Sequence, residues 1–475
     1  QMMALADAAE SYGRGWGHLT TRQDMELHWV RVEHVPDIWK RLERAGITTR
    51  STCGHTMRNV AACPNSAVCG DSLMDVEPWA KAISDYFVKR SEYINAKMPN
   101  RLNIYFAGCQ ECAAEAQIND IAFVPVRREE RVGFEVWVGG SLGGNPRVGL
   151  KMKDFIEPAD VLPVCQAVFE IHMKYGIRTK GKSRLKFLIE DWGIEKFTAQ
   201  FEKTFQEKRC MPENREFRIP VESRREREPS RAVRWWTRLT SGGNATPPAG
   251  CHPQRHPGYV RAVIDVPLGE IRPVQMRAVA EAARRYSNGE MRFTKDQDIE
   301  IHWVKSRSAG GLIGDLKRAG LGLKGGKLRV TSCVGTEFCI YAATNSQGAA
   351  REILKAMEAG DTKKAELIRD LTLSISGCPN SCAKQQVADI GLAGQLAAVG
   401  DERRFSYNLS VCGGMKPDKK TGLIKIGEVV RRKITEEQVT PALHALLDAV
   451  LDARQDGEGF QDVICRIGFK EIERQ

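Results

Sequence analysis

Apolar and polar positions alternate along the chain with two periods, which predicts a mixture of strands and helices. Residues 260–266 alternate in the manner of a strand, and residues 271–286 carry apolar side chains at helical spacing. Residues 290–304 are predicted to form a further strand with polar side chains interleaved. Residues 371–376 are predicted as a strand that leads directly into a pair of cysteines. The pattern therefore predicts an α+β fold.

The chain also repeats itself. Residues 18–30 align with residues 292–304 at an offset of 274, and seven of the thirteen positions are identical. With small drifts, this offset pairs Cys63 and Cys69 with Cys333 and Cys339, and Cys109 and Cys112 with Cys378 and Cys382. We therefore predict a first repeat over 1–207, a linker over 208–256 and a second repeat over 257–475. On this alignment the first repeat lacks a counterpart of the strand at 260–266.

Composition and charge narrow the class of protein. With 42% apolar and 28% charged residues among 475, a disordered or fibrous chain is excluded. The sequence shows neither an export signal nor an apolar run long enough to cross a bilayer, so we expect a cytoplasmic protein without membrane insertion. The net charge of +11 suits an anionic substrate or an acidic partner. A nucleic-acid partner is not expected, because no motif of a known binding module is present.

The second repeat contains four cysteines at a spacing typical of an iron–sulfur site. Five residues separate Cys333 from Cys339, and three separate Cys378 from Cys382. Thiolates suit iron because soft sulfur binds it well and their charge balances that of the cluster. A zinc ribbon with C-x2-C pairs is the alternative, but these two spacings fit it poorly.

The segments at 331–339 and 376–382 resemble the signature of the sulfite and nitrite reductase haemoprotein family, itself a tandem repeat. The resemblance implies a pseudo-two-fold duplicated unit, each copy combining a ferredoxin-like α+β half-domain with an α/β domain that binds sirohaem and a 4Fe-4S cluster. It implies six-electron reduction of sulfite to sulfide or of nitrite to ammonia. Cys382 would bridge cluster and sirohaem iron, and Cys333, Cys339 and Cys378 would complete the cluster. The rival is an iron–sulfur electron-transfer or assembly subunit without sirohaem.

The family also has cationic residues facing its substrate, and four positions of this chain match them. Arg22 and Arg58 correspond to two arginines that contact substrate and sirohaem, while Arg101 and Asn103 fall where the family has its next two polar positions. Arginine attracts an oxyanion and neutralises its charge. Three cations and one amide favour nitrite by charge, whereas the cysteines retained in the first repeat favour sulfite, so both substrates stay open.

Two further expectations concern the first repeat and the electron donor. Cys63, Cys69, Cys109 and Cys112 could bind a second iron–sulfur cluster, or they could be four reduced thiols. No flavin or nicotinamide motif is visible in the sequence. The glycine-rich segment at 139–144 does not have the G-x-G-x-x-G pattern of a dinucleotide site. Electrons are therefore expected from an external donor such as ferredoxin or a similar acidic carrier.

Overall fold

The computed structural model covers most of the chain. It describes residues 1–94, 97–109, 112–217, 219, 230–240, 247–358, 361–399 and 402–469. Part of the predicted linker, and the two residues between Cys109 and Cys112, lie outside the described residues. Within the described ranges, no helix is both long and apolar enough to span a membrane. The boundaries of the two repeats and the linker stay a prediction.

Two five-stranded sheets with the same topology confirm the duplicated fold. The first contains β3 (Met57–Ala62), β4 (Leu102–Phe106), β5 (Ile121–Arg128), β6 (Arg131–Val138) and β7 (Leu150–Ile156) in that order. The second contains β14 (Arg329–Ser332), β15 (Thr372–Ser376), β16 (Ile390–Val399), β17 (Glu402–Val411) and β18 (Glu428–Thr435). In both sheets the first three strands are parallel and the last two pair antiparallel.

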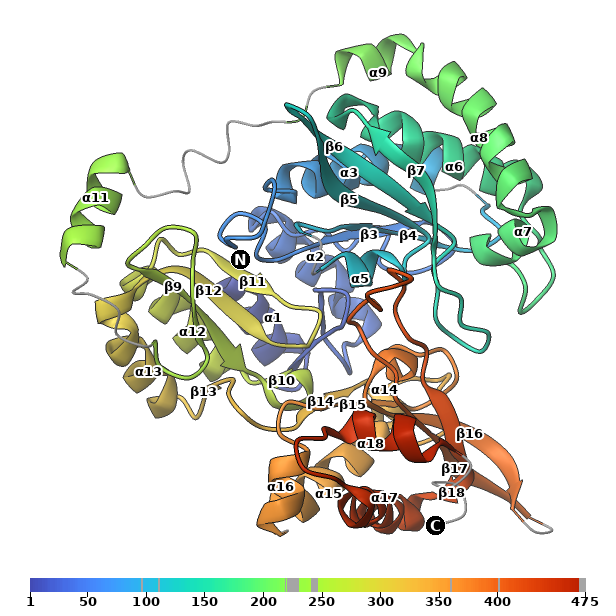
Figure 1. The fold of residues 1–475 in the computed structure, drawn as a ribbon. Helices are drawn as coiled ribbons and strands as arrows, with labels where there is room; N and C mark the ends of the chain where they lie inside the picture. The colour runs from blue at the N-terminus through green and yellow to red at the C-terminus, as the bar shows by residue number, and fades with distance from the viewer. Residues whose placement is uncertain are drawn as a thin grey trace.

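Helices complete a separate apolar core beside each sheet (Figure 1). The helices of the first repeat are α3 (Glu77–Val88), α4 (Ser91–Ile94), α5 (Ala113–Ala116), α6 (Val161–Tyr175), α7 (Leu185–Trp192), α8 (Ile194–Arg209) and α9 (Pro212–Glu216), of which α3, α6, α7 and α8 supply buried core residues. Those of the second are α14 (Gly335–Phe338), α15 (Ser346–Glu358), α16 (Thr362–Leu367), α17 (Val439–Ala453) and α18 (Phe460–Ile467), of which all but α14 supply them. Helix α11 (Arg231–Thr240) lies between the repeats in sequence.

Two ferredoxin-like half-domains share a third core. The first has α1 (Met2–Tyr12), β1 (Gly17–Leu19), β2 (Met25–Glu26) and α2 (Val35–Arg44). The second has β8 (Cys251–Pro253), β9 (Tyr259–Asp265), β10 (Glu270–Ile271), α12 (Pro273–Tyr286), β11 (Met291–Phe293), β12 (Ile299–Lys305), α13 (Ala309–Arg318) and β13 (Gly322–Leu323). Strand β10 of the second half-domain pairs with β1 of the first, so the small sheet contains strands from both half-domains.

Three of the four predicted elements are confirmed, as β9, α12 and β15. The single strand predicted over 290–304 is wrong, because β11 and β12 form a hairpin there. Its turn is closed by a hydrogen bond from the Thr294 amide to the Asp298 carbonyl at 2.9 Å. Among the described residues, no segment takes the place beside β2 that β9 takes beside β12.

Polar contacts join the two repeats through loops that connect the strands of their sheets. Gln117 Nε2 donates to the Gly422 carbonyl at 2.8 Å, and Gln386 Nε2 donates to the Gly143 carbonyl at 2.9 Å. The glycine-rich segment at 139–144 therefore lies at the repeat interface. Each repeat supplies backbone carbonyls that the other satisfies, so the loops are held in one relative position.

Candidate active site

The four cysteines of the second repeat lie in the loops that follow β14 and β15. These strands are parallel neighbours, with Ser332 opposite Ile375, so both loops leave the sheet at one edge. The Gly377 amide donates to Cys333 Sγ at 3.1 Å. Burial, reinforced by the neighbouring Cys333 and Cys378, raises the pKa of Cys382 to about 12. Several thiolates here require a compensating positive charge, which iron supplies.

Residues of the first repeat hold the Cys382 loop from outside. The Thr21 hydroxyl donates to the Cys382 carbonyl at 2.7 Å. Lys384 forms a buried ion pair with Glu115, and Lys295 Nζ lies 3.4 Å from the same carboxylate. The position of Cys382 therefore depends on both repeats.

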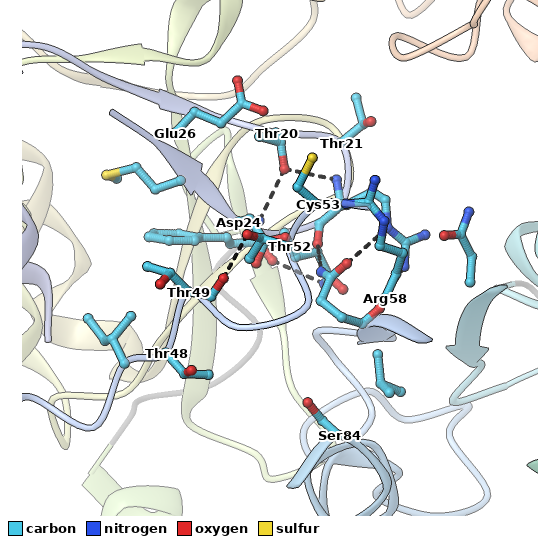
Figure 2. A pocket seen from close by; sticks show the side chains of 18 of the residues that line it. Thr20, Thr21, Asp24, Glu26, Thr48, Thr49, Thr52, Cys53, Arg58 and Ser84 are labelled. Atoms are coloured by element: carbon cyan, nitrogen blue, oxygen red, sulfur yellow. Dashed lines mark hydrogen bonds between the residues drawn. The ribbon is translucent and has the colours of Figure 1, made fainter. Parts of the chain in front are cut away.

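A cavity of about 1300 Å³ opens beside this loop. Figure 2 shows a close view of its wall, with Thr20, Asp24, Cys53 and Arg58 grouped around one region. Six of the predicted site residues line it: Arg22, Arg58, Arg101, Asn103, Cys339 and Cys382. Cys333 and Cys378 lie in the same loops but outside the lining.

Arg22 is fixed by two asparagines. Its Nε donates to Asn59 Oδ1 at 3.1 Å, and one terminal nitrogen donates to the Asn59 carbonyl at 2.7 Å. The other terminal nitrogen donates to Asn119 Oδ1 at 3.1 Å. Burial lowers the pKa of Arg22 from its ordinary value. Its hydrogen-bond partners are neutral amides, while the nearby carboxylates of Asp24, Glu115 and Asp120 favour its charged form.

Arg58 and Arg101 form a cationic wall with a third arginine, Arg184. Burial, together with the nearby cations Arg184 and Arg58, lowers the pKa of Arg101 to about 10. Burial also lowers the pKa of Arg58, whose Nε has no hydrogen-bond partner among the described residues. Cations this close repel one another, so an anion between them is strongly favoured.

Asp120 anchors Arg184 of this wall and the neighbouring Asn103. Its fully buried carboxylate accepts from Arg184 at 2.7 and 3.3 Å, and from the Asn103 backbone N–H at 2.8 Å. The side-chain Oδ1 of Asn103 has no hydrogen-bond partner among the described residues. Asn103 therefore borders the cavity with its backbone fixed and its amide oxygen available.

Sequence reasoning missed several residues that shape the cavity. Arg184 precedes α7 and lies in no recognisable motif. The buried Asp120 required a cationic partner, but nothing local in the sequence identified Arg184 as that partner. Asp24 falls inside the aligned motif at 18–30, and burial raises its pKa to about 6, against the lowering effect of Arg22 and Arg58. A carboxyl with that pKa exchanges protons near neutral pH.

The donor set fits an iron–sulfur cluster beside an anionic iron macrocycle. Four thiols from two loops suit the cluster, and Cys339 and Cys382 border the cavity. The cavity is large enough for a macrocycle, and Arg22, Arg58 and Arg101 offer cations to its carboxylates or to a small oxyanion. The unpartnered Nε of Arg58 and Oδ1 of Asn103 agree with a polar ligand.

The first-repeat cysteine set comprises Cys63, Cys69, Cys109 and Cys112. Most of this set lies outside the lining of the cavity. Cys63 follows β3, and Cys109 and Cys112 follow β4, which places them as their counterparts are placed after β14 and β15. Of these four, only Cys63 lines the cavity.

Two family models match the chain and together cover both repeats. The model "Nitrite and sulphite reductase 4Fe-4S domain" matches residues 53–209 and 325–475. The model "Nitrite/Sulfite reductase ferredoxin-like half domain" matches residues 1–45 and 252–319. Each model thus matches twice, in agreement with the internal repeat.

Individual relatives resemble the chain over almost its whole length. The ferredoxin–nitrite reductase of Leptolyngbya laminosa is 28% identical, over 96% of this chain and 84% of the relative. Sulfite reductase (ferredoxin) 1 of Mycolicibacterium paratuberculosis is 27% identical, over 99% of this chain and 80% of the relative. The solved structure of the Mycobacterium tuberculosis NirA protein superimposes with a TM-score of 0.80 at 25% identity, covering 99% and 82% of the two chains.

Proposed function

Because the chain belongs to the nitrite and sulfite reductase family, we propose that it carries out the six-electron reduction of nitrite to ammonia or of sulfite to sulfide. One observation carries the proposal. The loop of Cys382 and the arginines Arg58 and Arg101 border the same cavity, so electrons and an oxyanion meet there. The protein is accordingly an oxidoreductase with a 4Fe-4S cluster and, by family, a sirohaem.

The residues divide the work between holding the cofactors and handling the substrate. We propose that Cys333, Cys339, Cys378 and Cys382 would hold the cluster, and that Cys382 would also serve the sirohaem. When bound, the coupled pair supplies electrons to the atom being reduced. Thr21 fixes the carbonyl of Cys382, which limits the loop's movement. A second cluster in the first-repeat cysteine set is not part of this assignment.

The cationic wall binds and orients the oxyanion. Arg58 and Arg101 neutralise its charge, while Arg22, held by Asn59 and Asn119, contacts the sirohaem or the substrate from a fixed position. Oxygen atoms leave as water, so protons must reach them. Asp24 lines the cavity, and its carboxyl, with a pKa of about 6, can hold such a proton.

We propose ferredoxin, or a similar acidic carrier, as the electron donor. Two of the relatives above are a ferredoxin–nitrite reductase and a sulfite reductase (ferredoxin). This chain carries a net charge of +11, which favours encounter with an acidic protein. No site for a nicotinamide or flavin was found in the sequence.

An absorption spectrum and a turnover assay test the proposed function together. Protein purified without oxygen from sirohaem-producing cells should show a Soret band and a red-region band. With chemically reduced ferredoxin it should consume nitrite or sulfite and release ammonia or sulfide. A broad brown absorbance without a Soret band, and no turnover of either anion, would favour the rival electron-transfer or assembly subunit.

The balance between the two substrates should depend on Asn103. Arg184 is paired with Asp120, whereas Arg22, Arg58 and Arg101 form no ion pair among the described residues. Three cations and the amide of Asn103 thus border the cavity, which favours the singly charged nitrite. We expect Asn103→Lys to raise kcat/KM for sulfite relative to nitrite by about tenfold, equivalent to roughly 1.4 kcal/mol. Competition between the two anions under steady-state conditions measures this ratio. Asn288→Lys, on an exposed turn, is the matched control; an unchanged ratio in Asn103→Lys would show that Asn103 does not face the substrate.

A further inference from the structure

The first-repeat cysteine set lies on two neighbouring loops and has no role in the proposed reaction. Its two loops leave the sheet after β3 and β4, and the Cys63 amide donates to the Phe106 carbonyl at 2.8 Å, which joins the loops at their base. Cys63 and Cys109 are buried, and Cys69 and Cys112 are partly buried. The two loops that carry these cysteines therefore lie side by side at their base.

Cys112 stands at the centre of these sulfurs. Its Sγ lies 3.6 Å from Cys109 Sγ and also contacts Cys63. The amides of Gly108 and Cys109 donate to Cys112 Sγ at 3.0 and 3.2 Å. Cys69 lies close enough to Cys109 for the two thiols to interact electrostatically. Two backbone N–H groups thus point at the one sulfur of Cys112.

The sulfur spacing distinguishes this set from that of the second repeat. A tetrahedral zinc ion with Zn–S bonds of about 2.3 Å holds its sulfurs about 3.8 Å apart, close to the Cys109–Cys112 distance. The ligands of a 4Fe-4S cluster bind different irons and must stand further apart. In the second repeat, whose four cysteines are all described, no sulfur forms a hydrogen-bonding contact with another sulfur of the set. The C-x2-C spacing of Cys109 and Cys112 occurs in zinc sites and in iron–sulfur sites alike, so the sulfur distance carries the distinction.

We propose that Cys63, Cys69, Cys109 and Cys112 bind one zinc ion through four thiolates, as a structural site separate from the reaction. Among the described residues, no three cysteine, histidine, aspartate or glutamate side chains already stand in the arrangement of a bound ion. Binding therefore requires side-chain rotation, and Cys69, whose Sγ lies 4.0 Å from Asp71, is the thiol that must turn.

A bound ion would stabilise a contact between the first repeat and the second half-domain. Arg255, from the segment that enters the second half-domain, donates to the Cys69 carbonyl at 3.0 and 3.2 Å and to the Ser72 carbonyl at 2.7 Å. An ion that fixes the Cys69 loop would therefore also fix the carbonyl oxygens that accept hydrogen bonds from Arg255. The proposed zinc links the first repeat to the second half-domain through this arginine.

Metal content of the intact protein tests the proposal. Protein from zinc- and iron-replete cells should contain about one zinc per chain by mass spectrometry, and zinc-edge X-ray absorption should show about four sulfurs near 2.3 Å. Cys109→Ser with Cys112→Ser should lower zinc at least tenfold and leave iron unchanged. Cys165→Ser, which alters a buried thiol of α6, should retain zinc.

Three outcomes would overturn the proposal. Loss of about four irons from the double variant would establish a second cluster instead. Wild-type protein without zinc and with all four thiols reactive would establish reduced cysteines. Zinc bound mainly through nitrogen or oxygen would show an adventitious ion only. These readouts do not require sirohaem or turnover, so they can fail while the proposed reductase function stands.

Discussion

The Cys382→Ser variant is expected to lose reductase activity by at least about a hundredfold, to the background of the assay. Residues that only support a metal ligand typically cost 10- to 100-fold when replaced, so a ligand shared by two centres should cost no less. We expect cluster content to fall and the sirohaem bands to lose the influence of the cluster. Iron analysis, absorption and paramagnetic resonance spectra, and turnover of nitrite and sulfite measure these changes.

Cys210→Ser is the matched control for this variant. Cys210 is an exposed thiol at the end of α8, outside both cysteine sets, so its replacement tests the chemical change alone. It should keep wild-type iron content and rate. Full activity in Cys382→Ser would show that the assignment of Cys382 as the shared ligand is wrong.

Arg58→Gln is expected to lower kcat/KM for both anions by about 10²- to 10³-fold, the usual effect of removing one charged or hydrogen-bonding group that stabilises a reacting oxyanion. The residue lies in β3 on the cavity wall, and its Nε has no partner among the described residues. Its guanidinium is therefore available for a ligand. Steady-state kinetics with each substrate at fixed donor concentration measure the change.

Arg44→Gln serves as the control for the loss of one positive charge. Arg44 ends α2 on the exposed surface of the same repeat. Its replacement should leave kcat/KM within about twofold of wild type, as expected for a solvated surface charge. An effect below about threefold in Arg58→Gln would remove this residue from the substrate wall.

The duplicated sequence predicted much of the fold because similar segments at a constant offset must form similar structures. The two sheets share one strand order, and the hairpin β11–β12 shows where the pattern was insufficient. Residues 290–304 look continuous in polarity, but the turn from Thr294 to Asp298 divides them. A hairpin with polar residues on both sides of its turn has nearly the same alternation as one strand.

The candidate site could be predicted in part, for a related physical reason. Family motifs brought Arg22, Arg58, Arg101 and Asn103 to attention, and the structure places all four on one cavity. Arg184 escaped notice because its contact with Asp120 spans 64 positions and follows no periodicity. The roles of these residues in binding and catalysis stay predictions until the variants are measured.

The hydrogen bond from Thr21 to the Cys382 carbonyl bears on when the protein can acquire its cofactors. These residues are 361 positions apart, so they cannot meet until the chain up to Cys382 has left the ribosome. Until then the growing protein has the arginines of the cavity but not the full set of second-repeat cysteines. A cofactor held by these cysteines would therefore enter only after both repeats have been synthesised to this point.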